Sequence, residues 1–150
     1  QQDEANALVK MAFDSGINFY DTANVYSDGK SEEILGQSIR DLGLNRKELV
    51  IATKVFGRMG NGVNQVGLSK LHILDSVDES LQRLKMDHID LLYVHGVDDF
   101  TPLEETMRAL EDVVRAGKVR YLGVSNHAAW QIMKANAYAD MQSWNLFAAC

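Results

Sequence analysis

Residues 89–126 read IDLLYVHGVDDFTPLEETMRALEDVVRAGKVRYLGVSN, and this stretch predicts a strand, a helix and a second strand in succession. The two strands, 89–94 and 120–124, are short and mostly apolar, which is typical of parallel strands buried on both faces. The helix between them is expected to begin with a Thr-x-x-Glu capping box at Thr101 and to end at Gly117. A strand, a crossover helix and a parallel strand form the repeating unit of an α/β fold.

The same alternation continues on both sides of this unit. Further strands are expected at 18–20, 49–53 and 147–149, with helices in the gaps. Two of the helices carry an apolar stripe that would face the sheet: Leu71, Leu74, Val77, Leu81 and Leu84 in one, and Leu103, Met107, Leu110 and Val114 in the other. No Pro/Ser-rich linker interrupts the pattern, so we predict a single domain over 1–150. The pattern alone fits both a closed barrel and an open doubly wound sheet.

Length indicates that any barrel would be incomplete. A barrel of eight strand-helix units usually needs about 250 residues, whereas this chain has 150. Its first periodic segment, around Asn6, Val9 and Ala12, predicts an amphipathic helix with no strand before it. We therefore expect only part of a barrel.

The composition limits the classes of partner. With 46% hydrophobic and 24% charged residues the chain is typical of a soluble globular protein. The net charge is −6 and no block of Lys and Arg is present, which argues against nucleic acid or an anionic membrane as partner. The single cysteine, Cys150, fits a reducing compartment, and no apolar run approaches the roughly 20 residues of a membrane span. We expect a cytoplasmic protein, with its oligomeric state open.

Four polar residues follow short apolar runs and together suggest acid catalysis: Asp21, Tyr26, Lys54 and His95. Tyrosine alone is a poor proton donor near neutrality because its unperturbed pKa is about 10. A lysine ammonium beside the phenol favours the phenolate, and a carboxylate next to that lysine keeps it charged. A histidine can then align a carbonyl oxygen that receives the proton. This set of groups predicts carbonyl reduction.

Each of these residues also has a purely structural interpretation. Asp21 can cap a turn, Tyr26 can pack as a loop aromatic, and His95 can bond to a backbone carbonyl. Lys54 is more informative, because a lysine that ends the apolar run 50–52 would point into a barrel mouth and would need a carboxylate partner. Asp21 is the natural candidate for that partner.

The chain resembles the aldo-keto reductase family in five segments that follow in family order. These segments are GINFYDTANVY (16–26), SEEILG (31–36), IATK (51–54), IDLLYVH (89–95) with Asp98 and TPLEET (101–106), and GKVRYLGVSN (117–126). The resemblance implies a (β/α)8 TIM barrel, of which this chain would supply the N-terminal part, about five strand-helix units. It also implies an enzyme, an oxidoreductase that uses NADP(H), with NAD(H) the less expected cofactor.

The resemblance assigns roles to the candidate residues. Tyr26 would donate the proton to a small aldehyde or ketone, Lys54 with Asp21 would make the phenol more acidic, and His95 would orient the carbonyl. Ser125 and Asn126, together with Asp21, would contact the nicotinamide. The alternative is a regulatory or binding subunit on the same scaffold, similar to the voltage-gated potassium channel β subunits.

The remaining chemistry-bearing residues are expected to serve structure. His72, His88 and His127 show no spacing typical of metal ligands, so no metal site is predicted. A cluster of glycines lacks the lysine-serine ending of a nucleotide P-loop and is better interpreted as a mobile loop over the barrel mouth: Gly57, Gly60, Gly62 and Gly67. Trp130 and Trp144 are expected to be packing residues.

Overall fold

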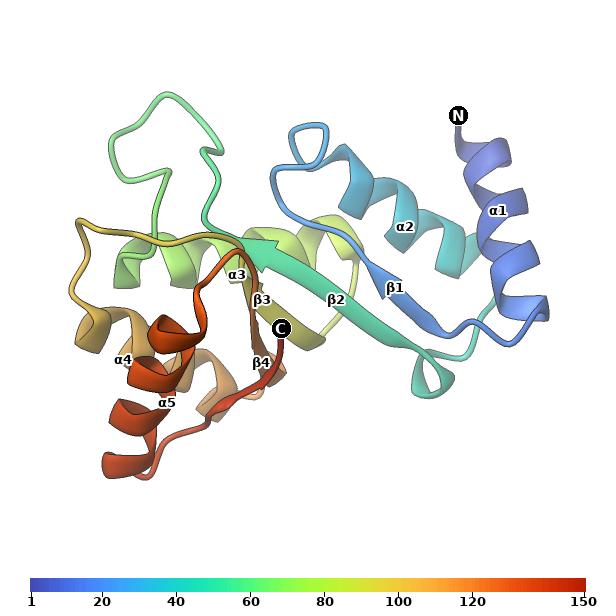
Figure 1. Cartoon of the computed structure of the whole chain (residues 1–150). Coiled ribbons are helices and arrows are strands. Elements are labelled where there is room, and N and C mark those ends of the chain that lie inside the picture. Colours follow the sequence, from blue (N-terminus) through green and yellow to red (C-terminus); the bar gives the residue numbers. More distant parts are fainter.

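A computed structural model describes residues 1–150 and shows strands alternating with helices (Figure 1). The elements in chain order are α1 (Gln2–Asp14), β1 (Phe19–Asp21), α2 (Lys30–Asp41), the short 3-10 helix η1 (Arg46–Glu48), β2 (Val50–Val55), α3 (Lys70–Leu84), β3 (Ile89–Val94), α4 (Leu103–Arg115), β4 (Val119–Val124), α5 (Ala129–Met141) and β5 (Phe147–Ala149). The expected α/β class is therefore correct.

The strands form one parallel sheet whose spatial order equals their order in the chain, β1-β2-β3-β4-β5. Each crossover passes through a helix, and crossovers of one hand place all such helices on the same side of a sheet. Consecutive helices also contact each other, from α1 with α2 to α4 with α5. Sequential parallel strands with one outer layer of helices are the arrangement of the N-terminal part of a (β/α)8 barrel.

The apolar core lies between the sheet and the helices. It is a cluster of 19 buried residues that includes Ile51 from β2, Ile73 from α3, Leu92 from β3 and Leu110 from α4. At the contact between α2 and α3, a side chain at Gly36 would have its Cβ only 2.3 Å from the carbonyl oxygen of Leu84. Glycine at this position therefore permits the close approach of the two helices. None of the helices is long and apolar enough to cross a membrane.

The strand predictions differ from the structure mainly at their ends. Strands at 89–94 and 147–149 are correct, whereas 18–20 is displaced by one residue from β1 and 120–124 misses the first residue of β4. The prediction of 49–53 is wrong at its carboxyl end, because β2 continues through Lys54 and Val55. A charged residue after an apolar run predicts a strand end, yet Lys54 stays in the parallel ladder, where it pairs with Tyr93 of β3.

Two helix details are also corrected. Thr101 does not cap α4: Pro102 is the N-cap residue and makes no side-chain bond, while the Thr101 hydroxyl donates to Asp98 Oδ2 at 2.8 Å. Leu71 does not face the sheet, since it is 50% exposed at the start of α3. Gly117 does end α4 as predicted, with φ of +74°, a left-handed conformation that favours glycine.

Candidate active site

The ammonium of Lys54 is the centre of the candidate site. The chain after β1 continues alongside β2, since the amide of Thr22 donates to the Ala52 carbonyl at 2.9 Å. This path places both Asp21 and Thr22 beside Lys54. Its Nζ forms an ion pair with Asp21 and donates to the carbonyl oxygen of Thr22 at 2.8 Å. The Lys54 side chain is only 8% exposed, so these acceptors replace most of its hydration.

Tyr26 lies on the loop between β1 and α2 and contacts the same ammonium. Lys54 Nζ is 3.4 Å from the Tyr26 hydroxyl oxygen and 5.0 Å from the centre of its ring. The Tyr93 ring, on the paired position of β3, has its centre 5.8 Å from the same nitrogen. Tyr26 keeps 40% of its surface exposed. The Tyr26 phenol is therefore close to a buried cation and still accessible to a ligand that enters from solvent.

His95 completes the group from the end of β3. Its amide donates to the Val55 carbonyl at 3.0 Å, and its ring meets the Tyr26 ring edge-on with centroids 5.7 Å apart. Burial and the positive charge of Lys54 lower the pKa of His95 below its ordinary 6.5, while Asp21 acts in the opposite direction. The imidazole is therefore neutral at neutral pH. The structure brings all four of the proposed catalytic residues together.

Ser125 and Asn126 follow β4 next to His95. The Ser125 amide donates to the Val94 carbonyl at 2.8 Å, and Asn126 has the left-handed φ of +59°. The side-chain amide of Asn126 donates to the His95 carbonyl at 2.7 Å and to Ser125 Oγ at 3.3 Å. The Asn126 side-chain oxygen and the Ser125 hydroxyl proton stay free. One acceptor and one donor match a carboxamide group, so this pair fits the nicotinamide end of a dinucleotide.

Glu32 supports the site from behind, and the sequence interpretation missed it. Its carboxylate is fully buried, accepts from Thr53 Oγ1 at 2.5 Å and forms an ion pair with Arg83 Nε at 2.6 Å. It thereby ties α2 and α3 to β2 at the residue before Lys54. The signal lay in the helical spacing: Glu32 shares one face of α2 with the buried Gly36 and Ile39. A carboxylate on the apolar face of a helix needs a partner.

The segment that connects Asp21 to Tyr26 contains a buried side-chain amide without a partner, that of Asn24. Around it, Thr22 Oγ1 donates to Ser31 Oγ at 2.7 Å, and the backbone N–H of Asn24 donates to the Lys54 carbonyl at 3.2 Å. Asn24 is fully buried, yet neither polar atom of its side chain has a hydrogen-bond partner. Buried amides generally bond to protein or to ordered water. Asn24 is therefore the polar group of this segment that the chain itself does not satisfy.

The other histidines lie outside this group. His72 is buried on α3, where desolvation lowers its pKa, and His88 bonds Asp87 at the protein surface. The glycine-rich loop after β2 is closed at its base, because the Gly67 amide donates to the Phe56 carbonyl at 2.8 Å. No group of three or more His, Cys, Asp or Glu side chains is placed to hold a metal ion.

Comparison with known proteins places this chain in a family. A family model described as "Aldo/keto reductase family" matches residues 1–145. The chain is 46% identical over 137 residues to a probable voltage-gated potassium channel subunit beta of Arabidopsis thaliana, covering 91% of the chain and 42% of that protein. It is 40% identical to versiconal hemiacetal acetate reductase of Aspergillus parasiticus (97% and 47% covered). It is 39% identical to aldo-keto reductase AMT2 of Alternaria alternata (94% and 45%). The chain thus spans about half the length of the curated relatives it matches.

Proposed function

The chain belongs to the aldo/keto reductase family, and on this basis we propose that the complete protein reduces an aldehyde or ketone to an alcohol. The observation that carries the proposal is the contact of Lys54 with both the Asp21 carboxylate and the Tyr26 hydroxyl, beside the His95 ring. Reductases among the relatives support the same class of reaction. A metal is not needed for the steps proposed below.

Tyr26 is the proposed general acid. As the carbonyl carbon accepts a hydride, negative charge develops on the carbonyl oxygen, and the Tyr26 hydroxyl donates its proton to that oxygen. The resulting tyrosinate is stabilised by the Lys54 ammonium, which Asp21 and the Thr22 carbonyl hold in place. Solvent then returns a proton to the exposed Tyr26. The neutral His95 can hydrogen-bond the carbonyl oxygen and so orient it toward Tyr26.

Ser125 and Asn126 are the proposed contacts for a nicotinamide dinucleotide, with Asp21 nearby. A reduced nicotinamide would supply the hydride. The free Asn126 oxygen and the free Ser125 hydroxyl proton support this assignment. We propose NADP(H) as the cofactor, and NAD(H) as the alternative.

A steady-state assay tests the proposal. The full-length protein is mixed with NADPH or NADH and a panel of simple aldehydes and ketones, and loss of the reduced cofactor is followed together with formation of the alcohol. We expect turnover with at least one aldehyde and a higher kcat/KM with NADPH. If neither cofactor is oxidised in the presence of any carbonyl, while the folded protein still binds a dinucleotide, the reductase proposal is wrong.

The second candidate is a regulatory subunit. Its support is the 46% identity to a probable potassium channel subunit beta. In this case the full-length protein would bind a voltage-gated potassium channel and would keep the dinucleotide without rapid turnover. Co-purification with such a channel, measured beside the carbonyl assay, distinguishes the two candidates because each has its own readout.

A further inference from the structure

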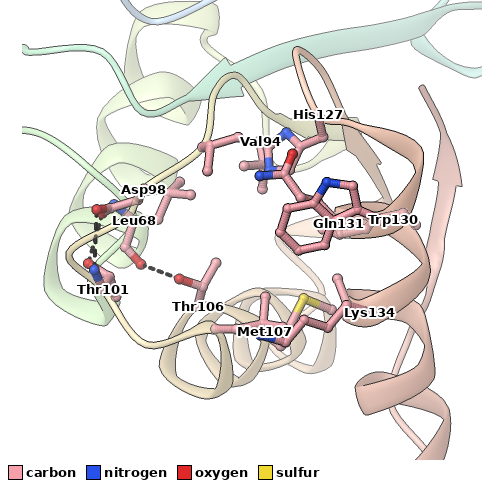
Figure 2. Close-up of a pocket in the computed structure, with 14 residues that line it drawn as sticks. Leu68, Val94, Asp98, Thr101, Thr106, Met107, His127, Trp130, Gln131 and Lys134 are labelled. Atoms are coloured by element: carbon pink, nitrogen blue, oxygen red, sulfur yellow. Dashed lines mark hydrogen bonds between the residues drawn. The ribbon is translucent and has the colours of Figure 1, made fainter.

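A hollow lies away from the Lys54 site, between the loop that follows β3 and the helices α4 and α5 (Figure 2). It has a volume of about 140 Å³ and 14 lining residues, of which eight are hydrophobic. Buried Val94, Met107 and Ala135 belong to its apolar lining, and Trp130, 66% exposed, stands at its edge. An engineered apolar cavity of about 150 Å³ accepts benzene. The hollow therefore has room for a single aromatic ring.

This pocket is on the opposite side of the sheet from the candidate active site. Lys54 pairs with Tyr93 and contacts its ring, so both side chains lie on one face of the sheet. Successive side chains of a strand point to opposite faces. Val94, the next residue of β3, therefore points into the helix layer, where it lines the pocket with Met107 of α4 and Ala135 of α5. A ligand here would not compete with a carbonyl beside Tyr26.

The charges of the pocket favour an anion at one end. The Asp98 carboxylate is already occupied, because it accepts hydrogen bonds from the Leu68, Phe100 and Thr101 amides and from the Thr101 hydroxyl at 2.7–3.2 Å. Lys134 lies on the opposite side of the pocket from Asp98 (Figure 2). Lys134 lines the hollow from α5, is exposed, and makes neither an ion pair nor a hydrogen bond within the chain. It is the only Lys or Arg side chain of the lining.

We propose that this pocket binds a small aromatic monocarboxylate, with its single ring against Val94, Met107 and Trp130 and its carboxylate at Lys134. The ring matches the volume and the apolar lining, and the carboxylate matches the unpaired ammonium. The inference does not depend on the reductase activity proposed above, because the residues that bind the ligand are not those of the Lys54 site.

Benzoate titration of the full-length protein, followed by NMR, tests the proposal. The indole N–H signal of Trp130 is assigned by its loss in Trp130→Phe, and that of Trp144 serves as an internal control, since Trp144 packs against Tyr138 and Arg108 outside the pocket. We expect the Trp130 signal to shift and saturate with benzoate while the Trp144 signal stays in place. Benzamide, with the same ring and no charge, should bind more weakly.

The charge contact is tested by Lys134→Gln. Loss of an exposed ion pair should weaken benzoate binding by about twofold to fivefold and should leave benzamide binding unchanged. Lys47→Gln, which removes the same charge from an exposed position far from the lining, is the matched control. The proposal is overturned if benzoate gives no saturable shift of Trp130, if benzamide binds as tightly as benzoate, or if Lys134→Gln has no more effect than Lys47→Gln.

Discussion

The Lys54 ammonium lies 3.4 Å from the hydroxyl oxygen of Tyr26, and this contact links β2 to the loop after β1. The two side chains differ in burial and in the number of groups that hold them. Lys54 is buried and is also held by Asp21 and by the Thr22 carbonyl, whereas Tyr26 is 40% exposed. A fixed cation next to an accessible phenol is an arrangement suited to proton transfer, because the charge that stabilises a phenolate does not need to move.

Tyr26→Phe in the full-length protein tests the proposed proton donor. The ring and its edge contact with His95 are kept, and only the hydroxyl is lost. General acid catalysis typically contributes about 10²- to 10⁴-fold, so kcat for carbonyl reduction should fall by that order. Cofactor affinity, measured by fluorescence titration with NADPH, should stay close to wild type.

The control for this variant is Tyr138→Phe. Tyr138 lies on α5 in the helix layer, packs edge-on against Trp144 and makes no side-chain hydrogen bond, so removal of its hydroxyl should leave kcat unchanged. Nearly full turnover in Tyr26→Phe would mean that another group donates the proton.

Asp21 and Lys54 are expected to act as one unit. Lys54→Met removes the cation, and Asp21→Asn removes its counterion while keeping the side-chain shape. Residues that work together in catalysis give non-additive losses. The double variant should therefore lose no more than about tenfold in kcat beyond the worse single variant. Steady-state kinetics of the three proteins measure this coupling, and losses that multiply would show that the two residues act independently.

The fold was largely predictable because each strand of a parallel sheet is a short apolar run between helices. Residues 89–94 and 147–149 gave the strand boundaries correctly. The errors have local causes. The charge of Lys54 predicts a strand end, but its ammonium contacts Asp21 and the Thr22 carbonyl while its backbone stays in the sheet. The spacing at Thr101 predicts a capping box, but the Thr101 hydroxyl donates to Asp98 instead of capping α4.

The candidate site was less predictable beyond its four main residues. Strand ends of a parallel sheet meet at one edge, so Asp21, Lys54 and His95 could be expected to converge. The carbonyl of Thr22 could not be expected, because every residue has one and only the path of the chain selects it. The pairing of Glu32 with Arg83 joins residues 51 positions apart and requires the contact of α2 with α3.

Glu32→Ala should destabilise the protein more than any exposed substitution on α2. It leaves Arg83, whose side chain is only 17% exposed, without its main counterion and removes the acceptor of the Thr53 hydroxyl. Removal of one partner of a buried ion pair typically costs about 3 kcal/mol or more. The free energy of unfolding from urea titration measures the loss. Glu33→Ala, which removes an exposed carboxylate next in sequence, is the control and should have little effect.

Asp98 holds the loops after β2 and β3 together, and Asp98→Ala should loosen both. The carboxylate accepts from the Leu68 amide on one loop and from the Phe100 and Thr101 amides on the other. Loss of these charge-assisted bonds should cost about 2 kcal/mol of unfolding free energy. Amide hydrogen exchange should also become faster at Leu68 and Thr101. Asp99→Ala is the matched control, because Asp99 is exposed and accepts no hydrogen bond. Equal exchange rates in the two variants would contradict this role.

The pH dependence of stability should include a contribution from His95. Burial and the Lys54 charge lower its pKa in the folded protein below the ordinary 6.5, and burial does the same for His72. As the pH falls through 6.5 the unfolded chain therefore binds protons that the folded protein does not, so stability is full above that pH and declines below it. Asp98 and Glu111 stay ionised in this window, because hydrogen bonds hold their pKa values below the ordinary carboxyl range despite burial.

Urea unfolding at about pH 7.5 and about pH 5 tests this contribution. The free energy of unfolding should fall more between the two pH values for wild type than for His95→Gln, because glutamine cannot titrate. An equal drop in the two proteins would mean that folding does not lower the pKa of His95, and that burial and the Lys54 charge do not act on the imidazole as described.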